Sequence, residues 1–427
     1  MIGRLSLILR AAARQIWVRA GLYGLGAIAT VALAGWAGPM LPAGAASSVN
    51  INTVRDLLEI MASSMLLVAT FSLGAMVAAF TAAATIATPR ASTILIDDPV
   101  AQNVLATFVG AFVFSIIALV ALTMGYYGDA GRVLLLIATS VVVLVVIATL
   151  FGWFDYLANM VRLGEIMNKV ERRARDALER SAAAPCLGGR RLESLPEGAR
   201  PVAHDEIGYV ASIDIAALDR VARKAAGEVY VLRPTGHMVE PSQPPVWTSW
   251  PVDPAERDAI RAAVSIGPER TFDHDPRYCL IVLSEIASRA LSPGLNDFGT
   301  AIETITRLQR LLIEWSAAAG AGASAPQTCD CPQVLIKPLE PDDLIDDAFG
   351  PLARDGAGFV EVGLRLQKAL ASLAAIGDEG FAAAVRRQSE RALEYARAEL
   401  TLESDRDRVE QAAAEVRAAA EGRRAPA

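Results

Sequence analysis

Apolar residues dominate the first 157 positions of the chain, and most charged residues follow them. Four apolar stretches are long enough to cross a hydrocarbon core of about 30 Å, which takes about 20 residues in a helix. They cover residues 17–38, 57–87, 104–127 and 133–156. The pattern therefore predicts an α-helical membrane domain with four transmembrane helices over residues 1–157.

Beyond residue 157, short β-branched runs and amphipathic helical stripes replace the long apolar stretches. The expected segments are a juxtamembrane helix and linker at 158–200, a small mixed α/β module at 201–252, a helical domain at 253–376 with a surface loop at 316–332, and a long amphipathic C-terminal helix at 377–427. The fold class is thus an α-helical membrane domain plus an α+β domain that is mainly helical, with a small β-rich module.

Helix boundary signals refine this picture. Asp253, Pro254 and Glu256 form the pattern of an N-cap, a first-turn proline and a capping-box partner, which predicts a helix up to about Val264. Further helices are expected over Asp275–Leu291, Phe298–Trp315, Phe359–Ile376 and Glu379–Gly422. The last of these either packs as a hairpin on its own domain or pairs with a neighbouring subunit.

Basic residues flank the membrane domain on both sides, before the first span and after the fourth. Because positive charge stays in cytoplasmic loops, both chain ends are predicted to be cytoplasmic in a multi-pass protein of the cell inner membrane. The charges are Arg4, Arg10, Arg14 and Arg19 on one side, and Arg162, Lys169, Arg172, Arg173 and Arg175 on the other. A signal peptide cleaved near Ala43-Gly44-Ala45 is the competing interpretation of the N-terminus.

Composition narrows the range of partners. The chain is 53% hydrophobic with a mean hydropathy of +0.35, so the lipid bilayer is its first expected partner. The formal net charge of −7 argues against nucleic acid. The sequence contains neither a Walker A loop nor a strand-linked GxGxxG motif, so it offers no nucleotide site.

The second span carries an unusual stripe of weakly polar residues, and no charge interrupts it between Ile60 and Pro89. Its members recur near the helical period and include Thr70, Gly74, Thr81, Thr85 and Thr88. Small residues and hydroxyls permit close helix packing, which is one explanation. The alternative is that these residues line a polar path in a homo-oligomer.

The segment RALSPGLNDFGTA, residues 289–301, lies between two predicted helices. Ser292-Pro-Gly294 stops the first helix, and Asn296 or Asp297 caps the second, as in an ordinary helical hairpin. The alternative is a ligand or anion site, because a helix start offers free amides and Arg289 supplies positive charge. The candidate site residues are therefore Arg289, Asn296 and Asp297.

The cysteines and histidines form no metal-binding pattern. Cys329-Asp-Cys331 brings two soft ligands together, but tetrahedral zinc needs two more at suitable spacing. His204 and His274 each have neighbouring carboxylates without a spacing that makes them converge. We expect no metal, cofactor or catalytic set, and the pattern favours a protein that is not an enzyme.

Several segments together resemble a bacterial family of predicted membrane proteins, domain of unknown function 2254. They are RALSPGLNDFGTA, Thr88-Pro89-Arg90, Gly208-Tyr-Val, Arg233-Pro234 before a glycine turn, Ile266–Thr271 and Asp275-Pro276. Two positions depart from the family pattern, namely Phe298, where proline is frequent, and Asp155-Tyr156, where paired histidines are frequent. The resemblance implies the membrane architecture and no particular reaction.

Three functions are compatible with these features. The first is an oligomeric channel-like or conduit protein with a cytoplasmic sensing or gating domain, acting on an ion or small molecule that the sequence does not name. The second is a membrane-anchored ligand sensor or enzyme that uses the region of Arg289, Asn296 and Asp297. The third is a membrane scaffold that recruits a cytoplasmic partner through its C-terminal helix.

Overall fold

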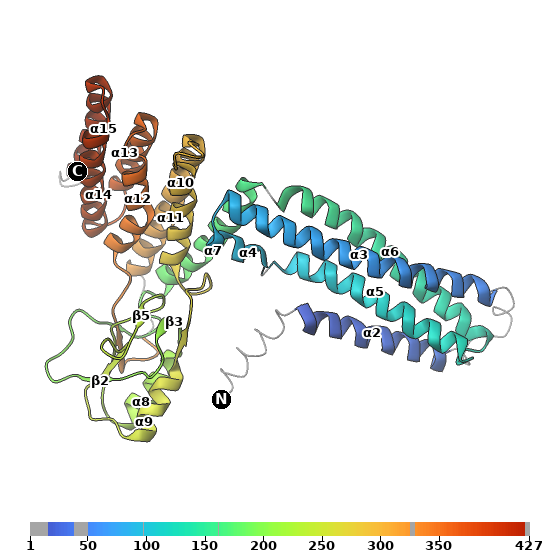
Figure 1. Ribbon diagram of the computed structural model, residues 1–427. Coiled ribbons are helices and arrows are strands. Elements are labelled where there is room, and N and C mark those ends of the chain that lie inside the picture. Colours follow the sequence, from blue (N-terminus) through green and yellow to red (C-terminus); the bar gives the residue numbers. More distant parts are fainter. Residues whose placement is uncertain (1–15, 38–49, 97, 161, 325–328, 423–427) are drawn as a thin grey trace. The chain divides into compact units, whose positions relative to one another are not determined.

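The computed structural model describes residues 16–37, 50–96, 98–160, 162–324 and 329–422 (Figure 1). It divides into two compact units, Met1–Ile166 and Met167–Ala427, which we call the N-terminal and C-terminal units. The segment Ala43-Gly44-Ala45 lies outside the described residues, as do Arg4, Arg10 and Arg14.

The N-terminal unit is entirely helical in its described part. Its helices are α2 (Ile16–Ala37), α3 (Ile51–Ile86), α4 (Pro89–Ile96), α5 (Pro99–Thr123) and α6 (Asp129–Met160). Three segments are long and apolar enough to cross a membrane, namely Ile51–Ile86, Val100–Thr123 and Ala130–Asn159. The first predicted span coincides with α2, in which the apolar helical stretch is Gly24–Leu33. A total of four spans therefore stays a prediction.

Helix α5 is the central helix of this unit. Half of the residues in the most apolar part of α5 are buried, compared with 22% for α3 and 17% for α6. Phe108 and Phe114 of α5 pack against apolar side chains of α3 and α6, including Leu58, Leu135 and Trp153. The broad apolar surfaces of α3 and α6 consequently remain exposed within one chain.

A short helix that the sequence pattern did not indicate follows α3. Thr88 lies between the two helices, and its hydroxyl accepts a hydrogen bond from the Ala91 amide at 3.1 Å. Pro89 is the first residue of α4. The backbone N–H at this position makes no hydrogen bond within a helix, so proline is tolerated there. Helix α3 ends at Ile86 with Ala87 as its C-cap, which agrees with the predicted end of the second span at residue 87.

The C-terminal unit begins with a mixed β-module whose strands are very short. They are β1 (Arg190–Arg191), β2 (Arg200–Val202), β3 (Gly208–Ile213), β4 (Val229–Val231), β5 (Met238–Val239), β6 (Val246–Thr248), β7 (Val264–Gly267) and β8 (Val334–Ile336). One sheet has the order β1-β8-β4-β6-β2 and the other β5-β3-β7. Strand β8 pairs in parallel with β1 and β4, and the remaining pairs are antiparallel.

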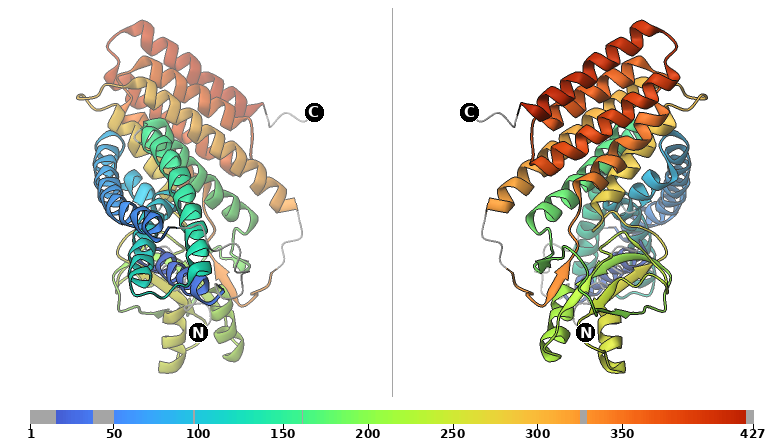
Figure 2. Two further views of the ribbon diagram at one scale, coloured as in Figure 1. Left: turned by 90° about the vertical axis from the view of Figure 1, so that its right-hand side faces the viewer. Right: turned by 90° about the vertical axis from the view of Figure 1, so that its left-hand side faces the viewer.

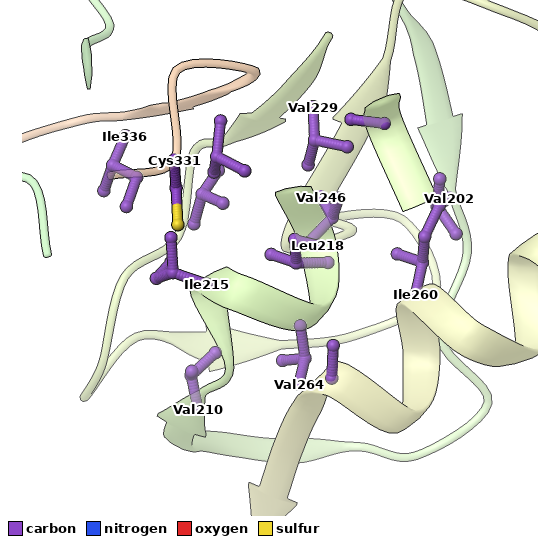
Figure 3. Packing of buried hydrophobic residues seen from close by; sticks show 14 of the residues in the cluster. Val202, Val210, Ile215, Leu218, Val229, Val246, Ile260, Val264, Cys331 and Ile336 are labelled. Carbon is purple, nitrogen blue, oxygen red and sulfur yellow. The ribbon is translucent and has the colours of Figure 1, made fainter. Parts of the chain in front are cut away.

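Two helices, α8 (Ile215–Lys224) and α9 (Pro254–Ala263), complete the β-module and cover its core. Leu218 of α8 and Ile260 of α9 pack with Val229 and Val246 of the larger sheet (Figure 3). The predicted module at 201–252 was therefore too narrow, because β1, β7 and β8 also belong to it. The capping box of Asp253 and Glu256 that starts α9 is confirmed.

The rest of the C-terminal unit is a stack of helical hairpins. Its helices are α7 (Leu163–Ala183), α10 (Pro276–Ala290), α11 (Phe298–Ser324), α12 (Pro341–Asp355), α13 (Val360–Ala374), α14 (Glu379–Glu399) and α15 (Glu403–Glu421). Helices α10, α12 and α14 lie side by side in one row, and α11, α13 and α15 in a second row (Figure 2). Three hairpins thus stack in two layers, as repeats do in α-solenoids.

Two boundary predictions were wrong. The expected single helix Glu379–Gly422 is the hairpin α14–α15, because Leu400 and Leu402 adopt extended backbone. The turn lets Leu400 and Val409 bury against the same apolar cluster, which one straight helix does not allow. The first part of the expected loop at 316–332 is helical as far as Ser324, and residues 325–328 lie outside the described residues.

A buried carboxylate joins α7 to the stack. Glu171 is only 4% exposed, and its two oxygens accept hydrogen bonds from Arg307 at 2.6 Å, Arg310 at 2.8 Å and Arg175 at 3.1 Å. Arg307 in turn also binds Glu303 and the Asn168 side chain. Burial of one carboxylate is tolerated here because three guanidinium groups replace its water.

We expect Glu171→Gln to free α7 from α11. Removing one partner of a buried ion pair costs about 3 kcal/mol. This corresponds to a roughly 100-fold larger equilibrium constant for the separation of α7 from α11. Hydrogen-exchange mass spectrometry of the full-length protein in micelles, on the amides of α7 and α11, measures this change. The control is Glu303→Gln, which removes a half-exposed partner of the same Arg307 and costs about 1 kcal/mol or less. Equal exchange in the two variants would show that Glu171 contributes no more than a surface charge.

Candidate functional site

Four of the sequence segments singled out above meet in one place in the C-terminal unit. Gly208-Tyr-Val starts β3, which pairs with β5 after the Pro234-Thr-Gly236 turn and with β7 at the start of Ile266–Thr271. The Gly236 amide donates to the Val210 carbonyl at 2.8 Å, and the Val210 amide donates to the His237 carbonyl at 2.9 Å. These segments thereby surround the N-terminus of α10 at Asp275-Pro276.

Asp275 is the centre of this arrangement and is almost fully buried. It caps α10 by accepting the Tyr278 amide at 3.0 Å. Arg270 binds the same carboxylate with two hydrogen bonds, Nε to Oδ2 at 2.7 Å and a terminal nitrogen to Oδ1 at 3.0 Å. The Arg270 guanidinium also lies 5.4 Å from the centre of the Tyr278 ring. One carboxylate thus serves as helix cap and as ion-pair partner.

A glycine makes room for this carboxylate. Gly236 has a φ of +87°, and a Cβ built on it would lie 2.1 Å from Oδ2 of Asp275. Any other residue at this position therefore both strains the turn and displaces the carboxylate. The glycine turn after Arg233-Pro234 is explained by this close approach.

A second pair of charges extends the site onto α12. Arg277 binds Asp347 through Nε at 2.6 Å and Asp343 at 2.9 Å. His237 is half-buried, and its Nδ1 lies 3.0 Å from the Pro234 carbonyl oxygen, so the neutral ring donates from Nδ1. We call the group of Arg270, Asp275, Arg277, Asp343 and Asp347, with His237 beside it, the Arg–Asp cluster.

Burial shifts two pKa values in the Arg–Asp cluster. Desolvation lowers the pKa of His237 below its usual 6.5, and the positive charges of Arg277 and Arg233 act in the same direction. Desolvation also raises the pKa of Asp347, although Arg277 opposes this effect. His237 is consequently neutral at pH 7. Because each guanidinium fork already binds a carboxylate of the chain, the geometry fits a clamp between the small sheet and helices α10 and α12.

The corner of α10 and α11 contains the sequence-predicted ligand residues. Asp297 caps α11, accepting the Thr300 amide at 3.0 Å and the Thr300 hydroxyl at 2.6 Å, and these hydrogen bonds lower its pKa. Asn296 adopts the left-handed conformation that the corner needs, with a φ of 52°. Among the described residues, no ion pair joins Arg289 to Asp297, and the buried Nε of Arg289 has no hydrogen-bond partner. These contacts are those of a helix cap.

The weakly polar stripe of α3 lies on the outside of its unit. Thr70, Gly74, Thr81 and Thr85 are exposed, and a Cβ added to Gly74 would meet nothing within 4 Å. Each of the three threonine hydroxyls donates to a carbonyl four residues earlier in the same helix. Thr88 is separate from them because it is buried and caps α4. The stripe is therefore not used for packing inside one chain.

The N-terminal unit also holds an apolar cavity of about 420 Å³. It lies among α2, α5 and α6 and is lined mainly by side chains such as Phe114, Val141 and Val145. Only Thr30 and Thr107 bring hydroxyl groups to it. Such a lining suits a hydrocarbon chain and not a hydrated ion.

Cys331 and His204 are both buried. Cys331 belongs to the β-module core, and its sulfur points toward Ile215 (Figure 3). His204 is buried, and neither ring nitrogen has a hydrogen-bond partner. Within the described part of the chain, no group of three or more His, Cys, Asp or Glu side chains has the geometry of a metal site.

The positions that depart from the family pattern have structural surroundings of their own. Phe298 is the first residue of α11 and is exposed. Tyr156 of α6 stacks on Trp153, with ring centres 5.5 Å apart and planes inclined by 14°. Tyr156 is thus part of an aromatic contact within α6.

We expect Gly236→Ala to destabilise the C-terminal unit strongly. The new methyl group strains the turn and separates Asp275 from Arg270, so the loss is about 3 kcal/mol or more. Gly198→Ala is the matched control, because Gly198 has a φ of +84° and open space around its Cβ position. The control should lose only about 1 kcal/mol, the strain of the backbone alone. Hydrogen exchange of β3 and α10 in the full-length protein distinguishes the two, and equal losses would contradict the role of Asp275.

We also expect the C-terminal unit to lose stability as the pH falls below 6.5. The folded pKa of His237 is lower than its unfolded value, so the unfolded state binds the proton more readily and protonation favours unfolding. His237→Asn keeps a donor toward Pro234 and should flatten the dependence of the unfolding temperature on pH between 7 and 5. Exposed His274 provides the control in His274→Asn. An unchanged pH profile in His237→Asn would assign the effect to other groups.

Comparison with known proteins agrees with the apolar helices. A family model described as predicted membrane protein (DUF2254) matches residues 13–372. Uncharacterized proteins of Mycobacterium bovis and Mycobacterium tuberculosis are 30% identical over 223 residues, which is 48% of this chain and 42% of each relative. The match thus spans less than half of these relatives. No solved structure matches the chain.

The family match covers most of the sequence, including the α3 stripe, the Arg–Asp cluster and the corner of α10 and α11. Its description gives membrane character. This chain belongs to the DUF2254 family of predicted membrane proteins.

Proposed function

We propose that the protein is a homo-oligomeric conduit of the cell inner membrane, in which the α3 helices of several copies meet and a cytoplasmic C-terminal unit gates or senses. The observation that carries this proposal is the outward orientation of the stripe formed by Thr70, Gly74, Thr81 and Thr85. None of these residues is among the buried residues of α3, and a Cβ added to Gly74 would meet nothing within 4 Å.

The dimensions and chemistry of the stripe suit a path between copies. From Thr70 to Thr85 it extends about 22 Å along the helix, most of a hydrocarbon core of about 30 Å. Its hydroxyl hydrogens are used within α3, so the threonine oxygens remain available as acceptors for a passing cation or water. Gly74 and Ala78 let neighbouring helices approach closely.

The link between membrane and C-terminal unit supports a gating role. Helix α7 starts at Leu163, three residues after the end of α6, and Glu171 binds it to Arg307 and Arg310 of α11. A ligand or partner that moves the stack would therefore also move α7. That coupling is part of the proposal.

Oligomeric state and ion flux test the proposal directly. We expect mass photometry of nanodisc-embedded protein to give an oligomer that Gly74→Leu weakens, because the larger side chain separates the α3 helices. Ala148→Leu is the control, since it also places a leucine on the exposed face of α6.

In liposomes we expect potassium flux above that of empty vesicles, lowered several-fold by the pair Thr81→Leu and Thr85→Leu. Ser140→Leu removes an exposed hydroxyl of α6, which also donates to its own helix, and should leave the flux unchanged. A monomer in nanodiscs, or no flux from the wild type, would remove the conduit proposal.

A membrane scaffold is the second candidate, favoured by the two-layer stack of hairpins α10 to α15. Stacks of this kind present extended surfaces to partners. Deleting residues 379–427 is a poor test, because α15 packs on α13 and its removal would uncover apolar side chains such as Leu366 and Leu370. Charge reversal at exposed Arg387 and Arg391 of α14 keeps the stack covered, and pull-down from membranes then reports partner binding.

The ligand-sensor alternative at Arg289, Asn296 and Asp297 has less support. Both oxygens of Asp297 and the nearby Thr300 amide are used in capping α11. An anion would have to displace these hydrogen bonds before it met the helix start.

A further inference from the structure

The three hairpin corners of the stack lie at the same end of the C-terminal unit. They are residues 291–297 between α10 and α11, 356–359 between α12 and α13, and 400–402 between α14 and α15. Their common position follows from the contacts along the two rows. Arg277 binds Asp347 and Arg391 binds Asp346, while Arg365 binds Gln309, so neighbouring hairpins run in the same direction (Figure 2).

Helix α7 also begins at this end, because it runs parallel to α11. Residues near the start of α7 contact residues near the start of α11, as in the 3.6 Å contact between the Met167 sulfur and the Thr304 hydroxyl. Later residues pair with later ones, as in the 3.2 Å hydrogen bond from Trp315 to Ser181. Leu163 lies about 6 Å before Met167 and Phe298 about 9 Å before Thr304 along their helices, so the two helix starts are nearly level.

The chain connection between α6 and α7 is short. Helix α6 contains the apolar segment Ala130–Asn159, and α7 starts only four residues after that segment ends. Four residues extend at most about 14 Å. The start of α7 therefore lies within about 14 Å of the last residue of this apolar segment.

Large apolar side chains are exposed at these corners. Leu295 is 53% exposed and Phe298 44% in the first corner, and Leu402 is 63% exposed in the third. The other large apolar side chains that are exposed in the described C-terminal unit are Leu187, Ile207 and Met238 of the β-module. Leu187 follows the far end of α7, about 30 Å along that helix from Leu163.

We propose that the corner face formed by Leu295, Phe298 and Leu402 binds the surface of the lipid bilayer. The three side chains enter the boundary between headgroups and acyl chains, where apolar residues are stabilised without crossing the membrane. Charges near the corners are mixed, with Arg354 paired to Asp355 and Asp297 engaged in its cap, so anionic lipid is not required. The motif RALSPGLNDFGTA accordingly acts as a membrane-contacting tip. The inference does not depend on the conduit proposal.

Site-specific fluorescence in vesicles tests the corner face. The full-length protein with Cys329→Ser loses its exposed thiol, while Cys186, Cys279 and Cys331 are buried. An environment-sensitive fluorophore is attached to Leu295→Cys or Leu402→Cys, with Leu187→Cys as the matched control. Vesicles of phosphatidylcholine are compared with vesicles that also contain a lipid spin-labelled near the headgroup.

We expect emission at positions 295 and 402 to be blue-shifted and several-fold weaker with spin-labelled lipid, at low and at high salt alike. Emission at position 187 should be unaffected by the spin label. No quenching at 295 and 402, as at 187, would overturn the proposal. A blue shift without lipid quenching would overturn it as well, because a protein surface such as a second copy would then cover the corners. Equal unfolding temperatures of the labelled variants ensure that folded proteins are compared.

Discussion

The burial of Glu171 under three arginines is the constraint on which the C-terminal unit depends. A carboxylate out of water is tolerated only where its partners are in place, so α7 can pack on α11 in one register alone. That register makes the two helices parallel. It also places the corner between α10 and α11 level with the start of α7, where the chain leaves the membrane helix α6.

The opposite end of α10 is held by a second buried carboxylate, Asp275. This carboxylate accepts a hydrogen bond from the first turn of α10 and binds the Arg270 guanidinium, and the glycine turn at Gly236 leaves room for it. The small sheet is thereby attached to the start of the hairpin stack. The C-terminal unit consequently has two different ends, one held by paired charges against the β-module and the other carrying exposed apolar corners.

The membrane helices follow a different rule, because their broad apolar faces need no partner in lipid. Half of the apolar segment of α5 is buried among its neighbours, whereas α3 presents Gly74 and its threonines outward. A hydroxyl bonded to its own helix is tolerated in lipid and equally in a contact between copies. Membership of the family establishes the membrane character of the chain.

Local signals in the sequence were sufficient for the apolar helices, for the capping box at Asp253 and for the helix start at Asp275, because each depends on neighbours within a few residues. They did not place β8 beside β4, split the C-terminal helix at Leu400, or bring Gly236 against Asp275. Those features depend on contacts between residues far apart in the chain. Burial of Leu400 and pairing of short strands outweigh the local helix or strand propensity of these segments. The sequence by itself determined the long apolar helices and the capped helix starts at Asp253 and Asp275. The tertiary structure decided which charges are buried together and which apolar corners are left exposed.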